Sequence, residues 1–214
     1  MSALRLSRAA LGVIAALVLA GCGGQVAPTS GVPQSLAPTN ATRGKSWILP
    51  EAKGENLLYI SDPASGGVLI FTYNPPSTPK SVGALLGLPA PAGMCVDKEQ
   101  NIFITNGLNR GTYVTLEYIH GGTNPIQVLG DPGNPVACSI DPTTGNLAIA
   151  TVGDYASGIA LYKKATGKPT LYSDSAFTDM WFCGYDDKGN LFVDGDGNTQ
   201  LAELPKGSKL LTLR

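Results

Sequence analysis

The sequence predicts an all-β fold, a β-propeller, and three observations lead to that prediction. A segment returns every 44 or 45 residues, because Asn101, Asn146 and Asn190 each precede a short apolar run. Glycine and proline separate these runs, as they separate short strands in β-proteins. The period is that of a propeller blade, a sheet of four strands. The 214-residue chain is therefore expected to hold about four blades.

Each copy can be divided into its expected strands. The first copy gives strands at 56–62, 68–73 and 81–86, without an obvious leading strand. The second gives 92–97, 101–106, 114–118 and 125–129. The third gives 136–141, 146–151, 158–162 and 169–172, and the fourth gives 181–186, 190–193, 201–204 and 210–213. The expected blades are 46–88, 89–132, 133–174 and 175–214. Because each blade must bury its faces against its neighbours, its strands are short and apolar.

A carboxylate precedes the turn between the first two strands in three copies. These residues are Asp97, Asp141 and Asp186. A carboxylate at this place accepts backbone N–H bonds and holds a tight turn. The sequence therefore predicts a structural role for all three.

One copy resembles a known repeat. Residues 91–106 begin with Pro91, Ala92 and Gly93 and continue through Asp97 and Asn101 into an apolar strand. This stretch resembles the NHL repeat, and the resemblance extends more loosely from residue 56 to the end of the chain. It implies a propeller of NHL-like blades and no particular activity, because such repeats occur in binding platforms, lyases and lactonases alike.

The number of copies leaves ring closure open. Closed propellers typically have about four to eight blades, and here three copies are complete. The favoured interpretation is a truncated reading frame or partial gene. The alternatives are a four-bladed ring, in which 46–49 supplies the missing strand, and a dimer that closes two half rings. An open ring would expose an apolar face and a strand edge, so self-association is then expected.

The N-terminus predicts export and lipidation. Basic Arg5 and Arg8 precede an apolar stretch at 9–19, which is typical of a signal peptide at 1–21. The sequence Leu-Ala-Gly-Cys at 19–22 resembles the bacterial lipobox, which implies a lipid anchor on Cys22. A flexible tether is expected over 22–45, before the propeller repeats at 46–214. Gly23, in place of an aspartate, favours the outer membrane or cell surface of a bacterial envelope.

The composition argues against nucleic-acid binding. The net charge is -1, only 14% of residues are charged, and lysine and arginine are scattered. A nucleic-acid-binding surface would need basic residues gathered in a patch. We therefore expect no nucleic acid among the partners.

Three cysteines remain beyond Cys22, and export makes disulfides possible. Relative to the turn carboxylates, Cys138 and Cys183 stand at the same strand position, and Cys95 stands one place later. Equivalent residues on adjacent blades point the same way and lie too far apart to bond. The expectation is therefore buried free thiols, and Cys95 with Cys138 is the first pair to examine for a disulfide.

A few polar residues have side chains that could bind a metal ion or take part in catalysis. His120, the only histidine, is expected in an exposed loop without a catalytic role. Asp194, Asp196 and Asn198 resemble the start of a calcium loop. Thr199 and Pro205 then stand where that loop needs glycine and glutamate, so a hairpin turn is the favoured interpretation and calcium the alternative.

Two classes of function remain. The first is a lipid-anchored envelope binding module for a protein, peptide or glycan, which needs no catalytic residue and no cofactor. The second is a metal-dependent hydrolase or lyase, similar to the propeller lactonases, with its site in the central channel. Asp62, Asn106 and Asp154 follow second strands and are the candidate ligands for that channel.

Overall fold

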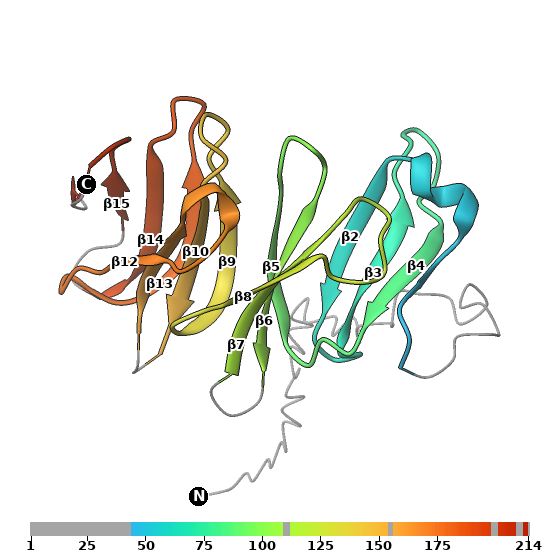
Figure 1. The fold of residues 1–214 in the computed structure, drawn as a ribbon, viewed down its shortest axis with the longest axis horizontal. Coiled ribbons are helices and arrows are strands. Elements are labelled where there is room, and N and C mark those ends of the chain that lie inside the picture. The colour runs from blue at the N-terminus through green and yellow to red at the C-terminus, as the bar shows by residue number, and fades with distance from the viewer. Residues whose placement is uncertain (1–43, 109–111, 154–155, 198–200, 209–211, 214) are drawn as a thin grey trace, which may run out of the picture. The chain divides into compact units, whose positions relative to one another are not determined.

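The structure is a computed structural model that describes residues 44–108, 112–153, 156–197, 201–208 and 212–213. These residues belong to one compact unit, 35–214. Within them, the strands form four antiparallel sheets of four strands each (Figure 1). No helix among the described residues is both long enough and apolar enough to cross a membrane. The predicted signal peptide, Cys22 and most of the predicted tether lie outside the described residues.

The sheets follow one another along the chain. The first sheet contains, in spatial order, β2 (Leu57–Asp62), β3 (Gly67–Thr72), β4 (Ser81–Leu86) and β1 (Trp47–Ile48). The second contains β5 (Pro91–Val96), β6 (Ile102–Leu108), β7 (Thr112–Tyr118) and β8 (Gln127–Gly130). The third contains β9 (Asn134–Ile140), β10 (Leu147–Val152), β11 (Gly158–Tyr162) and β12 (Thr170–Tyr172). The fourth contains β13 (Phe177–Tyr185), β14 (Leu191–Gly197), β15 (Leu201–Leu204) and β16 (Thr212–Leu213). In the described part of the chain, two short 3-10 helices, η2 (Pro50–Gly54) and η3 (Lys163–Ala165), lie between strands.

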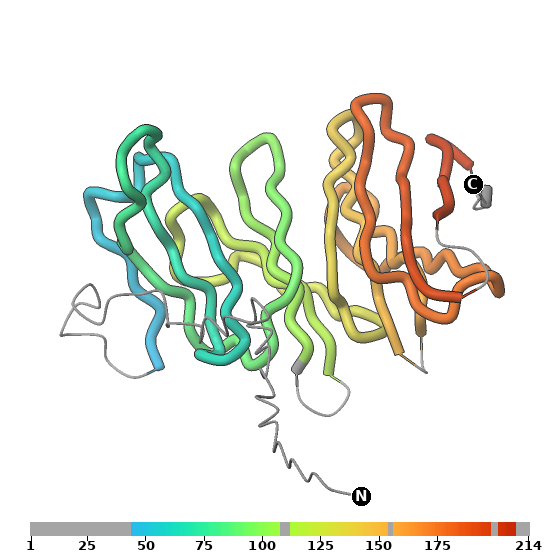
Figure 2. Tube along the Cα trace, turned by 180° about the vertical axis from the view of Figure 1, so that it is seen from behind, coloured from blue at the N-terminus to red at the C-terminus, as the bar shows by residue number. Residues whose placement is uncertain are grey.

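Consecutive sheets pack face to face, as Figure 2 shows from behind. Contacts join β2 to β5, β5 to β9 and β9 to β13. Each seam buries an apolar cluster: Val68 and Ile104 meet between the first and second sheets. Phe103 and Ile149 meet between the second and third sheets. Burial on both faces explains why these strands are apolar at nearly every position, which the repeat pattern predicted.

The segment expected to complete the first sheet takes a different place in it. Trp47 pairs with Ala84 and Ile48 with Gly83, so β1 lies beside β4. The leading position of the sheet lies at the other edge, where β2 has β3 as its strand neighbour among the described residues. The segment 46–49 thus supplies a fourth strand to the first sheet, as one of the alternatives expected, but it does so beside β4 and not at the leading position. Ser46 Oγ extends this contact by accepting a hydrogen bond from the Leu86 N–H at 3.0 Å.

Gly93, part of the repeat motif, lies where two strands approach closely. A Cβ added at Gly93 would lie 2.7 Å from the Val136 carbonyl oxygen and would also meet the backbone of Ala137 on β9. The absence of a side chain therefore allows β5 and β9 to pack together. This contact gives a physical reason for a glycine in the motif.

Replacing Gly93 by alanine is expected to lower the free energy of unfolding by about 1–3 kcal/mol, because the strands must move apart. Urea titration would measure the loss. Gly184→Ala on β13 is a matched control, since a Cβ there has no heavy atom within 4 Å. Equal stabilities for the two variants would contradict this account of Gly93.

Candidate functional site

The three turn carboxylates hold their hairpins, as predicted. Asp97 Oδ1 accepts the Asn101 N–H at 2.8 Å, and its Oδ2 accepts the Asn101 side-chain amide at 2.9 Å. Asp186 repeats the arrangement with Asn190, at 2.7 and 2.9 Å. Asp141 accepts the Thr143 N–H at 2.8 Å and the hydroxyls of Thr143 and Thr144. These carboxylates therefore serve the turns first, whatever else they contact.

Hydrogen bonding also keeps Asp141 ionised. Burial alone would raise the pKa of its carboxyl group. The bonds from Thr144 and Thr143 outweigh burial and hold the pKa below its ordinary value. The turn thus presents a fixed negative charge.

A cavity of about 490 Å³ lies at the seam between the second and third sheets, where these turns meet. The second sheet contributes residues of the 97–99 turn together with Glu117 and Gln127. The third contributes the 141–145 turn and the segment 164–166. We call this space the seam cavity. Its volume is within the range of small-ligand sites.

Glu117 supplies a buried carboxylate to the seam cavity. Its pKa is raised by burial, and the nearby charge of Asp97 adds to this effect. The side-chain amide of Asn101 opposes the shift through a hydrogen bond and also donates to Asp97. One amide thus stands between two carboxylates. A ligand that donates a hydrogen bond or carries positive charge would relieve their repulsion.

The opposite wall of the seam cavity has unusual backbone. Lys164 and Ala165 have φ values of 51° and 54°, the left-handed region that residues other than glycine rarely adopt. Hydrogen bonds hold them there: the Lys164 N–H donates to Asn146 Oδ1 at 3.0 Å, and Gln127 Nε2 donates to the Ala165 carbonyl at 2.8 Å. The second bond crosses the seam. Strained backbone that is held in this way is concentrated at functional sites.

A polar network joins the same two sheets. Asp131 accepts the Thr115 hydroxyl at 2.8 Å and the Tyr162 hydroxyl at 2.6 Å. Burial raises the pKa of the Asp131 carboxyl to about 6, although both hydroxyls oppose the shift. The seam therefore contains a carboxyl group that changes its charge near neutral pH.

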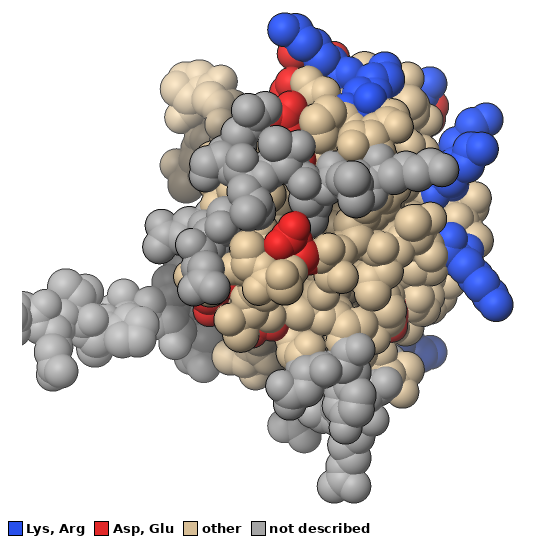
Figure 3. Space-filling view, turned by 90° about the vertical axis from the view of Figure 1, so that its left-hand side faces the viewer, with Lys and Arg blue, Asp and Glu red and all other residues tan. Residues whose placement is uncertain are grey.

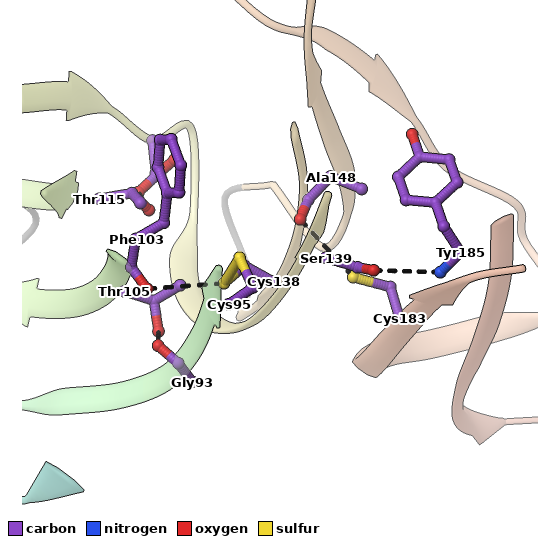
Figure 4. The surroundings of a disulfide bond; sticks show 11 residues. Gly93, Cys95, Phe103, Thr105, Thr115, Cys138, Ser139, Ala148, Cys183 and Tyr185 are labelled. Atoms are coloured by element: carbon purple, nitrogen blue, oxygen red, sulfur yellow. Dashed lines mark hydrogen bonds between the residues drawn. A yellow bond between two sulfur atoms is a disulfide. The ribbon is translucent and has the colours of Figure 1, made fainter. Parts of the chain in front are cut away.

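Cys95 and Cys138 form a disulfide across this seam, with Cα atoms 5.6 Å apart (Figure 4). The prediction of free thiols was wrong for this pair. Because Cys95 stands one place later in its strand than Cys138 does in its own, the two side chains leave opposite faces of their sheets. Those two faces are the ones that meet, so the offset brings the sulfur atoms together.

Cys183 is a free thiol, as predicted, and it shows the same relation at the next seam. Cys95 pairs with Phe103, and Ser139 pairs with Ala148 at the corresponding place of the third sheet. Cys183 on β13 lies next to Ser139, whose hydroxyl oxygen accepts the Tyr185 N–H at 3.0 Å (Figure 4). Burial raises the pKa of Cys183 to about 12, so its thiol is unreactive.

Two of the three predicted channel ligands accept hydrogen bonds from backbone N–H groups. Asp62 ends β2 and accepts the Ala64 N–H at 3.2 Å. Asn106 is buried in β6, and its Oδ1 accepts the Ala90 N–H at 3.0 Å. Asp154 lies outside the described residues. Asp62 and Asn106 belong to different sheets, and the structure gives each a separate local partner.

The first residues of the predicted calcium-like turn belong to a strand. Asp194 and Asp196 lie within β14, where they pair with Phe182 and Asp179. The strand continues because Gly195 and Gly197 allow β13 to approach; a Cβ on either would clash with β13 or the residue before it. Asn198 lies outside the described residues. In the part of the chain that the structure describes, no three His, Cys, Asp or Glu side chains gather as metal ligands.

His120 is more fixed than the sequence suggested. Its Nε2 lies 3.0 Å from the Glu55 carbonyl oxygen, and the next residue, Gly121, donates its N–H to the Tyr59 hydroxyl at 3.0 Å. The ring thus helps to join the first two sheets.

Sequence reasoning missed the residues that make the seam cavity. Glu117 and Lys164, which line it, stand in different strands or loops, and neither belongs to a recognisable motif. Only the packing of adjacent sheets brings their neighbourhoods together. The repeat of Asp97 with Asn101 was the one visible signal at this place.

Comparison with known proteins identifies a fold and no family. No protein-family model and no curated protein matches the chain. The structure of a nidogen/laminin complex matches with a TM-score of 0.55 and 15% identity over 73% of this chain and 60% of that chain. A functionally unknown protein from Desulfotomaculum acetoxidans matches with a TM-score of 0.56 and 16% identity over 80% of this chain and 54% of that chain. A gluconolactonase from Xanthomonas campestris matches with a TM-score of 0.53 and 13% identity over 71% of this chain and 59% of that chain.

The chain thus spans between 54% and 60% of the length of these three structures. At 13–16% identity the likeness concerns the fold alone. Together with the four antiparallel sheets, it confirms the prediction of an all-β, propeller fold.

Proposed function

We propose that this protein is an exported, lipid-anchored β-propeller of the bacterial cell envelope that binds its ligand in the seam cavity. The lipobox at 19–22 supports the anchor on Cys22. The disulfide between Cys95 and Cys138 independently supports export, because disulfides persist in oxidising compartments. The outer membrane or cell surface is the proposed location.

The seam cavity is the observation that carries the proposal of a binding module. It is concave, it lies between two sheets that a disulfide joins, and strained backbone forms one wall. Such a site is largely formed before the ligand arrives, which lowers the entropy cost of binding.

The charges of the seam cavity favour a peptide. Asp97 and Asp141 are committed to their turns, and Lys98 pairs with Glu99 at 3.4 Å. Glu117 and Lys164 then remain to meet a ligand from opposite walls. A peptide offers a basic side chain to the first and a carbonyl or carboxylate to the second. A glycan, which offers hydroxyl groups without positive charge, is the alternative ligand.

Binding of the full chain, kept in mild detergent, to arrays of basic peptides and of glycans would test the proposal. Glu117→Gln is expected to weaken peptide binding about tenfold or more, because a buried bond to a charged group is lost. Glu203→Gln is the matched control: Glu203 faces Phe192 on β14 just as Glu117 faces Phe103 on β6. Equal binding by the two variants, or binding to neither array, would overturn the proposal.

The enzyme alternative rests on the resemblance to the gluconolactonase, which is a likeness of fold. A lactone-hydrolysis assay separates the two classes. Activity that a chelator abolishes and added metal restores would favour the hydrolase, with Asp62, Asn106 and Asp154 as the residues to replace first. Peptide binding that a chelator leaves unchanged would favour the binding module.

A further inference from the structure

The fourth sheet presents an apolar face that no other described element covers closely. Phe182, Phe192 and Leu201 are 64%, 36% and 42% exposed. They share one face, because Asp194 lies opposite both Phe182 and Leu201 and stands two places from Phe192 on β14. Figure 3 shows this end of the molecule: lysines lie along its upper and right-hand margin, and a few acidic side chains stand among the uncharged residues of the middle. We call this surface the fourth-sheet face.

The corresponding face of the second sheet is buried against the third sheet. Phe103 stands opposite Glu117, as Phe192 stands opposite Glu203. Phe103 is 1% exposed because the third sheet covers it, whereas Phe192 is 36% exposed. The fourth-sheet face therefore has the residue pattern of a surface on which another sheet packs.

The first sheet presents the complementary surface. In the second sheet, Ile102 and Ile104 pack against the first sheet and are 2% and 0% exposed. In the first sheet, Leu57 and Tyr59 face the second sheet, so the alternate residues Leu58 and Ile60 face away. Leu58 and Ile60 are 37% and 43% exposed. Leu69 and Phe71 of β3 stand opposite them and extend this surface, the first-sheet face.

We propose that the fourth-sheet face of one copy packs on the first-sheet face of a second copy, and that two copies close one ring. The contact would repeat the packing of consecutive sheets inside each copy. It is heterologous, because two different surfaces meet, and such contacts close into rings when the rotation permits. Two copies bring eight sheets, within the range of about four to eight blades in closed propellers.

A second copy is the occupant that these faces favour. The chain carries both surfaces of the contact, and the large exposed side chains of each are aliphatic or aromatic, although Asp194 also lies on the fourth-sheet face. The apolar residues also lie together, as at protein interfaces, instead of singly as on ordinary surfaces.

Light scattering of the full chain in mild detergent tests the proposal, with the detergent mass subtracted. We expect twice the mass of one chain over a wide range of concentrations. Phe192→Lys on one face and Ile60→Glu on the other should each give the single-chain mass. The double variant places opposite charges on the two faces and should recover the pair, and salt should weaken it.

Val128→Glu is the control, because Val128 is 56% exposed on β8, the outer strand of the second sheet, away from both faces. It should keep the doubled mass. A single-chain mass for the unaltered protein would overturn the proposal, as would a pair that Phe192→Lys and Ile60→Glu leave intact. Mass that grows continuously with concentration would also overturn it, because an open series of copies is not a closed pair.

Discussion

Replacing Cys95 and Cys138 together by serine is expected to lower the free energy of unfolding by about 4 kcal/mol. The disulfide joins residues separated by 43 positions, so it removes many conformations from the unfolded chain. The bond also links the second and third sheets, whose contact forms the seam cavity. Chemical denaturation of the variant and of the oxidised protein would measure the difference.

Cys183→Ala is the control for this change. Cys183 is a free thiol, so its replacement should cost much less than the loss of the disulfide. A reducing agent should destabilise the unaltered protein and leave the double serine variant unchanged. Free thiols on Cys95 and Cys138 in the purified, oxidised protein would contradict the prediction, as would equal stabilities of the double variant and Cys183→Ala.

The stability of the fold should fall by about 3 kcal/mol as the pH rises from about 4 to about 7, through the titration of Asp131. Its pKa rises from an ordinary value of 3.8 to about 6 in the folded protein. Below 3.8 the carboxyl group is protonated in both states, and above 6 it is ionised in both. Between these values the folded state holds the proton more tightly, so raising the pH favours unfolding.

Asp131→Asn isolates this effect, because the amide keeps the shape and cannot ionise. The variant should lose the decline in stability between pH 4 and 7, and at pH 7 it should be more stable than the unaltered protein. Equilibrium unfolding at several pH values would measure both effects. Asp141 acts in the opposite direction, since its lowered pKa gives stability that is lost only below its ordinary range. An unchanged pH dependence in Asp131→Asn would contradict the role assigned to this carboxyl.

Local patterns in the sequence predicted the fold well because each blade is a local structure. The 44-residue or 45-residue period and the Asp97, Asp141 and Asp186 turns depend on neighbours along the chain, and the structure confirms both. The disulfide was not predicted correctly, because its pairing depends on which faces of two sheets meet.

The candidate site was largely hidden from the sequence for the same reason. The pKa of Glu117 depends on burial and on a hydrogen bond from Asn101, which arise only in the folded protein. The left-handed backbone of Lys164 cannot be read from the sequence, because lysine rarely adopts it. The sequence at 194–197 indicated a turn because it is rich in aspartate and glycine. Its glycines serve the close approach of β13 instead, a requirement that arises only when the strands are paired.

Cys95, Ser139 and Gly184 occupy one corresponding place in three successive sheets, and their chemistry differs from seam to seam. In the second sheet the place holds a covalent bond to the third sheet, and in the third sheet it holds a hydroxyl that accepts one hydrogen bond from the fourth. In the fourth sheet the place has no side chain. The molecule is consequently graded in mechanical strength along its length. A pulling force or a protease would therefore separate the fourth sheet first. The second and third sheets, which the disulfide joins, would come apart together and later.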